Sequence, residues 1–368
     1  MTPAEPSSDR ALLDHSRALI RSLQTREGAY PASPSFSAYK GFCWFRDGAF
    51  IADGMSAAGE VDSVDAFFAW CASVVRRYGD NIRAAVDGAA AGAPLADADM
   101  LPARFTFDGG RDGGDDWWDF QLDGFGTWLW ALDAHAKRHG SDIRPHADAV
   151  ALTVDYLISS WDRPCFDWWE EHDEQIHIST LGCVGAGLEA AARMGVLDAA
   201  RTEAAASAAD AIRHVILSQG VVDGHLVKWI GTTAVDASLT ALISPLGFIP
   251  ADHPVARSTV DAVESELAVD DGVHRFAADT FYGGGQWPLL SCFVGLARFA
   301  LGDADKAAAY FDWAVSTATP SLDLPEQVDR HLLAPERRQE WIDKWGEVAT
   351  PLLWSHAMVL RLAKELDR

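Results

Sequence analysis

Two adjacent carboxyl groups follow two adjacent tryptophans in the run Cys165–His172, which reads CFDWWEEH. An apolar wall disfavours the charged form of a carboxyl group, and a neighbouring carboxylate adds to that effect. A glutamic acid that stays protonated near neutral pH can act as a general acid, and Glu170 is the candidate. A helix start with a packed aromatic pair explains the same run without chemistry, so the interpretation depends on finding a partner for Glu170.

Acids, arginines and aromatic residues recur in stretches ahead of alternate predicted helices. Aromatic rings suit the apolar C–H faces of a sugar, while Asp and Arg side chains hydrogen-bond its hydroxyl groups. Each aromatic residue alone could be a packing residue, but their clustering favours one sugar-binding funnel. The stretches are Trp44-Phe45-Arg46-Asp47, Asp115-Asp116-Trp117-Trp118-Asp119, Trp168-Trp169-Glu170-Glu171, Lys228-Trp229, Arg275 with residues 281–287, and Glu326-Gln327 with Trp345.

Hydrolysis of a glycoside needs two carboxyl groups. One protonates the leaving oxygen, and the other attacks carbon or activates water. We choose Glu326, in the run LPEQVD, as the partner of Glu170, because its loop is expected at the same end of the fold. A solvated loop glutamate is the plain alternative for Glu326.

The elements that must position these residues are twelve predicted helices. A short hairpin is expected near 104–109, inside a long Ala-, Gly- and Asp-rich connection that runs to about residue 117. The helices are expected at residues 8–25, 47–58, 62–78, 120–138, 144–160, 176–194, 197–218, 234–243, 252–268, 286–301, 304–318 and 349–366.

The predicted helices differ in their apolar faces. Segments 286–301 and 349–366 are apolar nearly all round, which indicates burial on every side. Segments 8–25 and 62–78 carry charges on one face only. This alternation predicts an all-α fold, an (α/α)6 barrel of six inner and six outer helices, with residues 1–368 forming a single catalytic domain. An α-helical solenoid is the rival, and it would need a sequence repeat that is not visible.

Charge and cysteine content narrow the setting in which the protein works. The 368 residues carry a formal net charge of −24, which makes nucleic acid and anionic membranes unfavourable partners. The five cysteines form no C-x-x-C motif, so buried free thiols in a reducing compartment are expected. No leader and no apolar run near the roughly 18 residues of a membrane span are visible, so we expect a cytoplasmic protein.

No cofactor and no catalytic metal are predicted. Asp115 and Asp116 could hold calcium, but no His or Cys ligand spacing supports a catalytic metal site. A small carbohydrate is the expected partner, and the sequence leaves the oligomeric state open.

From about residue 39 to the C-terminus, the chain resembles glycoside hydrolase family 15, the group of glucoamylases, glucodextranases and isomaltose glucohydrolases. Each motif is short, but their order and spacing together are fairly specific. The motifs are Trp44-Phe45-Arg46-Asp47, Gln121-Leu122-Asp123, Trp169-Glu170-Glu171, Arg275 with Tyr282-Gly283-Gly284-Gly285-Gln286-Trp287, and Glu326-Gln327.

The resemblance implies an (α/α)6 barrel and an inverting mechanism that releases β-glucose from the non-reducing ends of α-glucosides. It implies that Glu170 is the general acid and Glu326 the general base. It also implies a set of substrate contacts with separate roles. These are Arg46 and Asp47 on the terminal glucose, Arg275 as a further sugar-binding arginine, and Glu171 at the next subsite. Apart from the resemblance, the aromatic residues Trp44, Trp117, Trp169 and Trp287 of the stretches ahead of the helices, and Tyr39 before them, are expected to contact the sugar.

Two departures from the family pattern refine this expectation. Many bacterial members carry an N-terminal β-sandwich domain, whereas this chain begins almost directly with the barrel, which favours short substrates such as isomaltose or isomalto-oligosaccharides. The family also has a tyrosine shortly before its Arg-Asp pair that assists the water site. Tyr39 is the nearest candidate here, although Phe42 lies at another position that is commonly aromatic.

Four other functions stay open at the level of sequence. A trehalase or a maltooligosaccharide-specific glucohydrolase would belong to the same family. A sugar epimerase or isomerase on an α/α barrel would need histidines in the funnel, for which His172 and His177 are candidates. A glucan-binding protein without activity would bind sugar and release no glucose.

Overall fold

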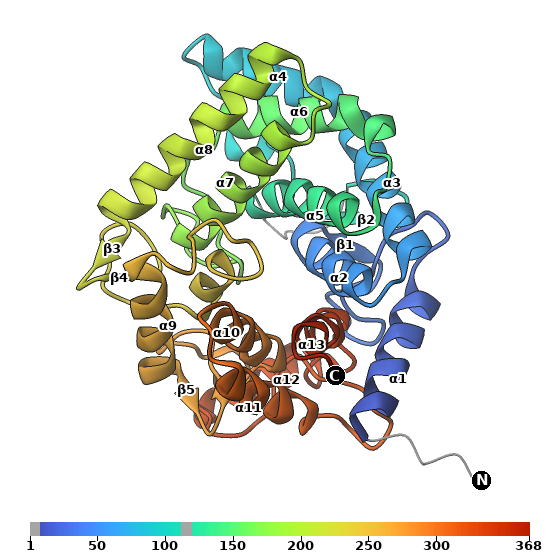
Figure 1. Cartoon of the computed structure of the whole chain (residues 1–368), viewed down its shortest axis with the longest axis vertical. Helices are drawn as coiled ribbons and strands as arrows, with labels where there is room; N and C mark the ends of the chain where they lie inside the picture. The colour runs from blue at the N-terminus through green and yellow to red at the C-terminus, as the bar shows by residue number, and fades with distance from the viewer. Residues whose placement is uncertain (1–7, 112–119) are drawn as a thin grey trace.

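Six helical segments form a closed inner ring in the computed structural model, which describes residues 8–111 and 120–368. Each segment packs against the next along the chain, and the last returns to the first (Figure 1). The ring therefore forms the inner layer of the predicted barrel. Its members are α2 (Phe45–Ala57), α5 (Asp123–His139), α7 (Ile178–Arg193), the 3₁₀ helix η3 (Ala237–Leu242), α10 (Pro288–Ala300) and α13 (Leu353–Glu365).

Outer helices cover this ring and complete the (α/α)6 barrel. They are α1 (Ser8–Leu23), α3 (Val61–Arg77), α6 (Ala147–Ile158), α8 (Ala199–Gln219), α9 (Pro254–Leu267) and α11 (Ala304–Val315). Helix α1 packs on α13, α3 on α2, α6 on α5, α8 on α7, α9 on η3 and α11 on α10 (Figure 1). Their outward faces carry the charges that the amphipathic segments predicted.

Glycines set the close approach of neighbouring inner helices. A Cβ atom on Gly126 of α5 would lie 2.3 Å from the carbonyl oxygen of Cys183 on α7, and one on Gly54 of α2 would lie 2.3 Å from that of Ala357 on α13. Both contacts are far shorter than van der Waals distance. Any side chain at these positions would push the inner helices apart and widen the barrel.

The structure corrects three of the helix predictions. Helix α4 (Gly79–Ala90) occupies part of the predicted long connection, and only a narrow stripe that includes Ile82 and Ala85 is buried. Helix α12 (Arg338–Trp345) was also missed, and none of its residues is fully buried. The predicted helix 234–243 is a 3₁₀ helix of six residues, η3, which ends shortly before Pro245.

The predicted hairpin near 104–109 is wrong in its pairing. Strand β2 (Arg104–Thr106) pairs antiparallel with the distant strand β1 (Phe42–Trp44), which leads directly into α2. This pairing fixes Trp44 and the start of α2 at the rim of the barrel. The remaining short elements are β3 (Val221–Val222), β4 (His225–Leu226), β5 (Ala268–Val269), β6 (Gly272–Val273), η1 (Asp97–Asp99), η2 (Arg144–His146), η4 (Phe281–Gly283) and η5 (Pro335–Arg337).

Four aromatic side chains fill the middle of the barrel. The rings of Phe50 and Trp354 stack with centroids 5.3 Å apart and an interplanar angle of 9°. Trp168 and Phe293 pack on this pair with centroid distances between 5.1 and 6.1 Å. The barrel is therefore closed by side chains on its axis, and a ligand can enter only as far as this aromatic layer. No helix in the described part of the chain has the length and apolar character needed to cross a membrane.

Candidate active site

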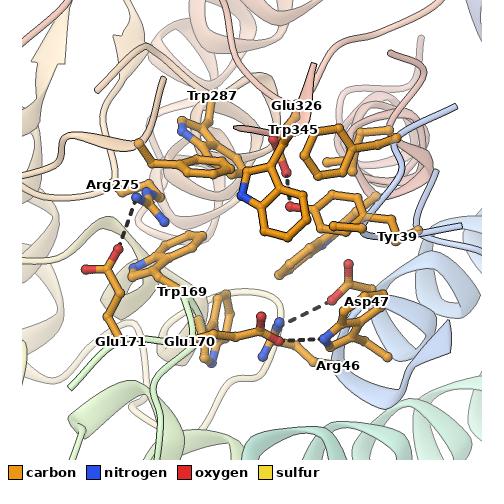
Figure 2. Close-up of a pocket in the computed structure, with 18 of the residues that line it drawn as sticks. Tyr39, Arg46, Asp47, Trp169, Glu170, Glu171, Arg275, Trp287, Glu326 and Trp345 are labelled. Carbon is orange, nitrogen blue, oxygen red and sulfur yellow. Dashed lines mark hydrogen bonds and ion pairs between the residues drawn. The ribbon is translucent and has the colours of Figure 1, made fainter. Parts of the chain in front are cut away.

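The connections that lead into the inner helices meet at one end of the barrel and enclose a pocket of about 260 Å³ (Figure 2). Ten of the eleven predicted site residues line it, while Trp117 lies outside the described residues. Trp168 and Trp354 of the aromatic layer form part of the lining, so the pocket is closed toward the barrel interior. The ten residues are Tyr39, Trp44, Arg46, Asp47, Trp169, Glu170, Glu171, Arg275, Trp287 and Glu326.

Glu170 lies in a tight turn, and the run around it is not a helix start, because α7 begins only at Ile178. Its φ angle is +63°, in the left-handed region that residues other than glycine seldom adopt. Trp44 Nε1 donates a hydrogen bond of 2.6 Å to Glu170 Oε1. The turn therefore directs this carboxyl group into the pocket, where an indole N–H from β1 holds one of its oxygens.

Asp167 builds the turn that carries Glu170. Its Oδ1 accepts hydrogen bonds from the backbone N–H of Trp169 at 2.9 Å and of Glu171 at 3.0 Å. The backbone N–H of Glu170 donates to the Asp167 carbonyl oxygen at 3.1 Å. One buried carboxylate thus satisfies the turn and fixes the direction of three consecutive side chains.

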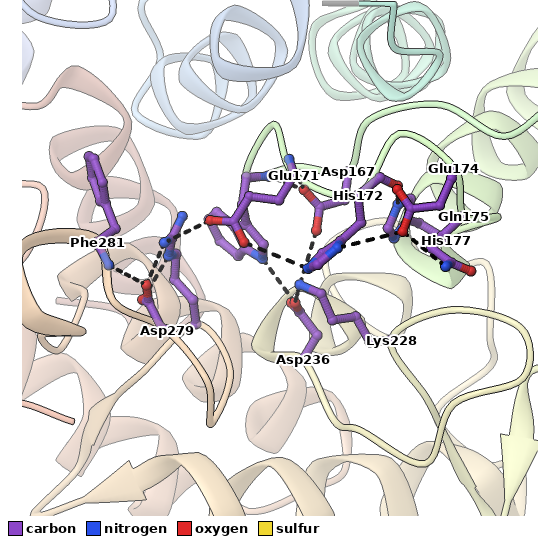
Figure 3. Close-up of polar contacts among 12 residues, drawn as sticks. Asp167, Glu171, His172, Glu174, Gln175, His177, Lys228, Asp236, Asp279 and Phe281 are labelled. Carbon is purple, nitrogen blue, oxygen red and sulfur yellow. Dashed lines mark hydrogen bonds and ion pairs between the residues drawn. The ribbon is translucent and has the colours of Figure 1, made fainter. Parts of the chain in front are cut away.

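A buried lysine connects this turn to the wall of the barrel (Figure 3). Lys228 Nζ lies 3.0 Å from Asp167 Oδ2 and 2.5 Å from Asp236 Oδ2. Asp236 Oδ2 also accepts a hydrogen bond of 2.9 Å from Trp169 Nε1. The charge of Lys228 lowers the pKa of Asp167 against the opposing effect of burial, and the two carboxylates raise the pKa of Lys228. Lys228 therefore positions the Glu170 turn from two sides.

Replacing Lys228 with methionine is expected to lower the free energy of unfolding by about 3–5 kcal/mol at pH 7, because two buried carboxylates lose their counter-charge. Urea unfolding measures this change. The matched control is Lys137→Met, which removes an ion pair to Asp133 from a lysine side chain that is 56% exposed, and it is expected to cost less than about 1 kcal/mol. Equal losses in the two variants would contradict a structural role for the Lys228 network.

Glu326 lies on the opposite side of the pocket from Glu170 (Figure 2). It is 2% exposed, and its Oε1 accepts a hydrogen bond of 2.8 Å from Tyr39 Oη. Burial raises the pKa of Glu326 to about 7, against the lowering effects of the Tyr39 hydrogen bond and the Arg275 charge. Its Oε2 is buried and has no hydrogen-bond partner among the described residues. A carboxyl group in this setting changes its charge near neutral pH and has one oxygen available to accept a proton.

The first turns of α13 hold the strand-like segment that carries Glu326. The backbone N–H of Leu324 donates to His356 Nε2 at 2.9 Å, and Ser355 Oγ donates to the Pro325 carbonyl oxygen at 2.8 Å. Burial lowers the pKa of His356 to about 3, so its ring stays neutral and accepts this bond. The segment is therefore fixed to an inner helix directly before Glu326.

Arg46 and Asp47 occupy the first turn of α2, at the bottom of the pocket. Arg46 Nη1 donates to Gln121 Oε1 at 2.5 Å and lies 3.2 Å from Asp123 Oδ2. Its Nε lies 3.4 Å from Asp47 Oδ2. Burial raises the pKa of Asp47 to about 6, although the charge of Arg46 acts in the opposite direction. These two side chains present a hydrogen-bond donor and an acceptor to a hydroxylated ligand.

Arg275 is enclosed by aromatic rings on the side of the pocket nearer to Glu171. Its guanidinium carbon lies 5.3 Å from the ring centre of Trp169 and 5.5 Å from that of Trp287. Its Nε donates to Asp279 Oδ2 at 2.8 Å, and its Nη2 lies 3.3 Å from Glu171 Oε1. The Glu171 side chain is 37% exposed, and burial raises its pKa. Glu171 is therefore the more solvent-exposed member of this pair, while Arg275 is as buried as Arg46 and Asp47.

Several lining residues were not assigned to the site from the sequence. Phe281 and Trp345 were noted in the rim stretches, and Trp168 was noted beside Glu170, without a predicted contact to the ligand. Trp341 and Lys344 lie on α12, the helix that was missed, so their spacing gave no signal. The unassigned lining residues are Ala32, Phe36, Ala38, Trp168, Phe281, Trp341, Lys344, Trp345, Leu352 and Trp354.

Comparison with solved structures supports the barrel. A structure described as a wild-type glycosidase superposes with a TM-score of 0.96 at 48% identity, covering 100% of this chain and 99% of that chain. A variant of a glycosidase with the same TM-score and identity was solved in complex with glucose. A glucoamylase from Hormoconis resinae superposes with a TM-score of 0.66 at 15% identity, over 97% of this chain and 73% of that chain, which supports the fold alone.

Comparison of sequences identifies the family. An isomaltose glucohydrolase from Kribbella flavida is 51% identical over 359 residues, 96% of this chain and 92% of that protein. A trehalase from Mycobacterium tuberculosis is 28% identical and aligns over 79% of this chain but only 45% of its own length. The family model described as glycosyl hydrolases family 15 matches residues 8–321. This chain is a glycoside hydrolase and belongs to glycosyl hydrolases family 15.

Proposed function

We propose that this enzyme is an inverting, exo-acting α-glucoside hydrolase that releases β-glucose from the non-reducing end of short α-glucosides, with isomaltose as the main substrate. The observation that carries the proposal is a pocket closed at its inner end, with Glu170 and Glu326 on opposite sides (Figure 2). A closed pocket admits a chain end and no internal glucose unit. Inversion requires a water molecule between the sugar and the second carboxyl group, and we place this water beside Glu326 Oε2.

In this proposal Glu170 is the general acid and Glu326 the general base. Glu170 donates its proton to the glycosidic oxygen, and Trp44 Nε1 orients the carboxyl group for this step. Glu326 removes a proton from the attacking water through Oε2, while Tyr39 Oη holds Oε1. The bond to the leaving oxygen breaks as the bond to water forms on the opposite face, and the product is therefore β-glucose.

The substrate contacts are proposed on the same geometry. Arg46 and Asp47 bind hydroxyl groups of the terminal glucose, and Trp44, Trp169 and Trp287 cover its apolar faces. Tyr39 keeps the role expected from the sequence, and Arg275 and Glu171 contact the second sugar. Trp117 lies outside the described residues and stays an expectation from the sequence. Arg46 and Asp47 are both less than a tenth exposed, so their hydrogen bonds to substrate form away from bulk water, where solvent weakens them less than at an open surface.

One observation favours isomaltose, and a second favours a short substrate. The Kribbella flavida relative that shares 51% identity is an isomaltose glucohydrolase, and it aligns along 92% of its own length. A cavity of about 260 Å³ is also smaller than the roughly 300–1,000 Å³ of sites for drug-sized ligands, which suits a disaccharide better than a polymer. The trehalase relatives are more distant, with 26–30% identity.

No histidine is among the described residues that line the pocket, which disfavours the sugar epimerase alternative. His177 forms a hydrogen bond between Nε2 and the His172 carbonyl oxygen at 2.9 Å, next to the Lys228 network (Figure 3). His172 lies at the outer side of the Glu170 turn with 41% of its side chain exposed. Both histidines therefore have places outside the proposed glucose site.

The location in the cell and the domain organisation are proposed together. All five cysteines are buried free thiols, which suits a reducing compartment, and we propose that the enzyme acts in the cytoplasm as a single catalytic domain.

The test of the proposed function is glucose release from isomaltose, maltose, trehalose and dextran measured side by side, with proton NMR of the first product. Isomaltose is expected to have the highest kcat/KM of the four, and the β-glucose signal is expected to appear before the α-glucose signal. If α-glucose appears first, the enzyme retains configuration and the assignment of Glu326 as a base is wrong. A higher kcat/KM for trehalose would identify a trehalase instead.

A further inference from the structure

A short helix beyond the family match borders the pocket. Helix α12 (Arg338–Trp345) follows Glu326 in the chain, and the family model ends at residue 321. Three of its eight residues, Trp341, Lys344 and Trp345, line the pocket. In Figure 2 the Trp345 indole lies in front of the space between the two catalytic glutamates. A ligand that leaves the glucose site toward solvent therefore passes this helix.

Helix α12 is attached to the rim on two sides. Tyr282 Oη donates a hydrogen bond of 2.8 Å to the Gly346 carbonyl oxygen, directly after the helix. The Trp341 ring stacks on Tyr282 with a centroid distance of 6.4 Å and an angle of 30°. On the other side, Ser37 Oγ donates to the Trp345 carbonyl oxygen at 3.4 Å. These contacts come from segments far apart in the chain, so α12 bridges the pocket mouth between them.

The pocket side of α12 has the chemistry of a sugar-binding surface. Lys344 Nζ lies 5.3 Å from the ring centre of Trp341 and 5.0 Å from that of Trp345. The ammonium group is exposed, and both indoles are half-buried. Indole faces can cover the C–H groups of a sugar, while the ammonium group donates hydrogen bonds to its hydroxyls. The Glu171 carboxylate, also partly exposed, borders the same pocket.

We propose that Trp345 and Lys344 form the outer wall of the leaving-group subsite and select glucosides whose leaving group is a single sugar unit. The inference rests on the proposed glucosidase function. With the terminal glucose held at Arg46 and Asp47, the second sugar lies between the Glu171 side and α12. A third sugar would meet the bridging helix, because Trp341, Lys344 and Trp345 of α12 line the cavity.

The test compares kcat/KM of the wild type and Trp345→Ala on isomaltose, isomaltotriose and α-glucosyl fluoride. Loss of the Trp345 contact with the second sugar is expected to lower kcat/KM on isomaltose by about 10–100-fold. The ratio of isomaltotriose to isomaltose is expected to rise about tenfold, because the third sugar gains room. The loss on α-glucosyl fluoride is expected to be smaller, because fluoride is one atom and does not reach α12.

Ile342→Ala is the matched control, since Ile342 lies on the same helix, is partly buried and does not line the pocket. It is expected to keep the wild-type ratios on all three substrates. The inference is overturned if Trp345→Ala leaves the ratio of kcat/KM on isomaltotriose to that on isomaltose unchanged. It is also overturned if Trp345→Ala lowers kcat/KM on α-glucosyl fluoride as much as on isomaltose, or if Ile342→Ala raises the isomaltotriose to isomaltose ratio as much as Trp345→Ala does. A wild type that hydrolyses none of the three would overturn the proposed function as well, so the two failures are distinguishable.

Discussion

Replacing Glu326 with alanine is expected to lower kcat on isomaltose by about 10²–10⁴-fold, with KM changed by much less, because a general base acts only in the transition state. The variant removes the carboxyl group whose Oε2 faces the proposed water and leaves a small space in its place. Steady-state kinetics on isomaltose measures both constants. The loss corresponds to about 3–5 kcal/mol of transition-state stabilisation.

A small nucleophile distinguishes loss of the base from loss of structure. Azide is expected to enter the space left in Glu326→Ala and to restore turnover of α-glucosyl fluoride, with β-glucosyl azide as the product. Glu347→Ala is the control, since the Glu347 side chain is 77% exposed and lies outside the main pocket. Its kcat is expected to stay within about twofold of the wild type, in line with other surface substitutions. Formation of α-glucosyl azide would contradict attack from the Glu326 side.

The pH dependence of the wild type also tests whether Glu326 is the general base. A general base must be ionised to accept a proton, and burial raises the pKa of Glu326 to about 7. As pH falls through this value, Glu326 takes up a proton and kcat/KM is expected to fall tenfold per pH unit on the acidic side. A kcat/KM that stays constant from pH 7 to pH 5 would contradict the assignment.

The sequence was sufficient for five helices of the inner ring, while the sixth member, η3, is shorter than predicted and is a 3₁₀ helix. Arg46 and Asp47 lie in the first turn of α2, so a correct helix register places them at one end of the barrel. Glu326 lies in the long connection that leads through α12 to α13, so its place depends on how that connection folds. Apolar periodicity determines that register, because a helix buried on every side has few polar positions. The predicted place of Arg46 and Asp47 therefore follows from local pattern alone.

Contacts between distant segments were outside the reach of sequence reasoning. Lys228 was noted only as part of a rim stretch, and its pairing with Asp167 and Asp236 depends on how two connections fold over each other. Helix α12 has polar residues on most of its surface and packs by the Trp341 ring on a neighbouring loop, so it shows no apolar stripe of core type. Lys228 and the residues of α12 contribute to the site through tertiary contacts, which patterns in a single sequence do not encode.

The left-handed turn at Glu170 is a further feature that the sequence did not show. Glutamate has no preference for positive φ, and the run CFDWWEEH also suits a helix start. Asp167 favours the turn over a helix, because its side chain accepts hydrogen bonds from the backbone N–H groups of Trp169 and Glu171. Strain of this kind persists only where the surroundings determine it fully, and such positions cluster at active sites.

Replacing Glu170 with glutamine is expected to lower kcat on isomaltose by about 10³-fold, because a sugar alkoxide leaves poorly without a proton. Glutamine keeps an oxygen that can accept the hydrogen bond from Trp44 Nε1, so the turn is expected to persist. On α-glucosyl fluoride the loss is expected to be much smaller, since fluoride leaves without protonation. The ratio of the two losses measures acid catalysis separately from binding.

The contrast between the two substrates is what makes the Glu170 assignment testable against a purely structural role. A disturbed turn would move Trp169 and Glu171 as well, and kcat would then fall by the same factor on both substrates. Glu174→Gln is the matched control, since Glu174 follows the same turn with 62% of its side chain exposed and lies outside the pocket lining. If Glu170→Gln and Glu174→Gln show the same kinetics on isomaltose, the proton donor is another group. A selective loss on isomaltose in Glu170→Gln, with β-glucosyl azide formed only by Glu326→Ala, would separate the acid from the base.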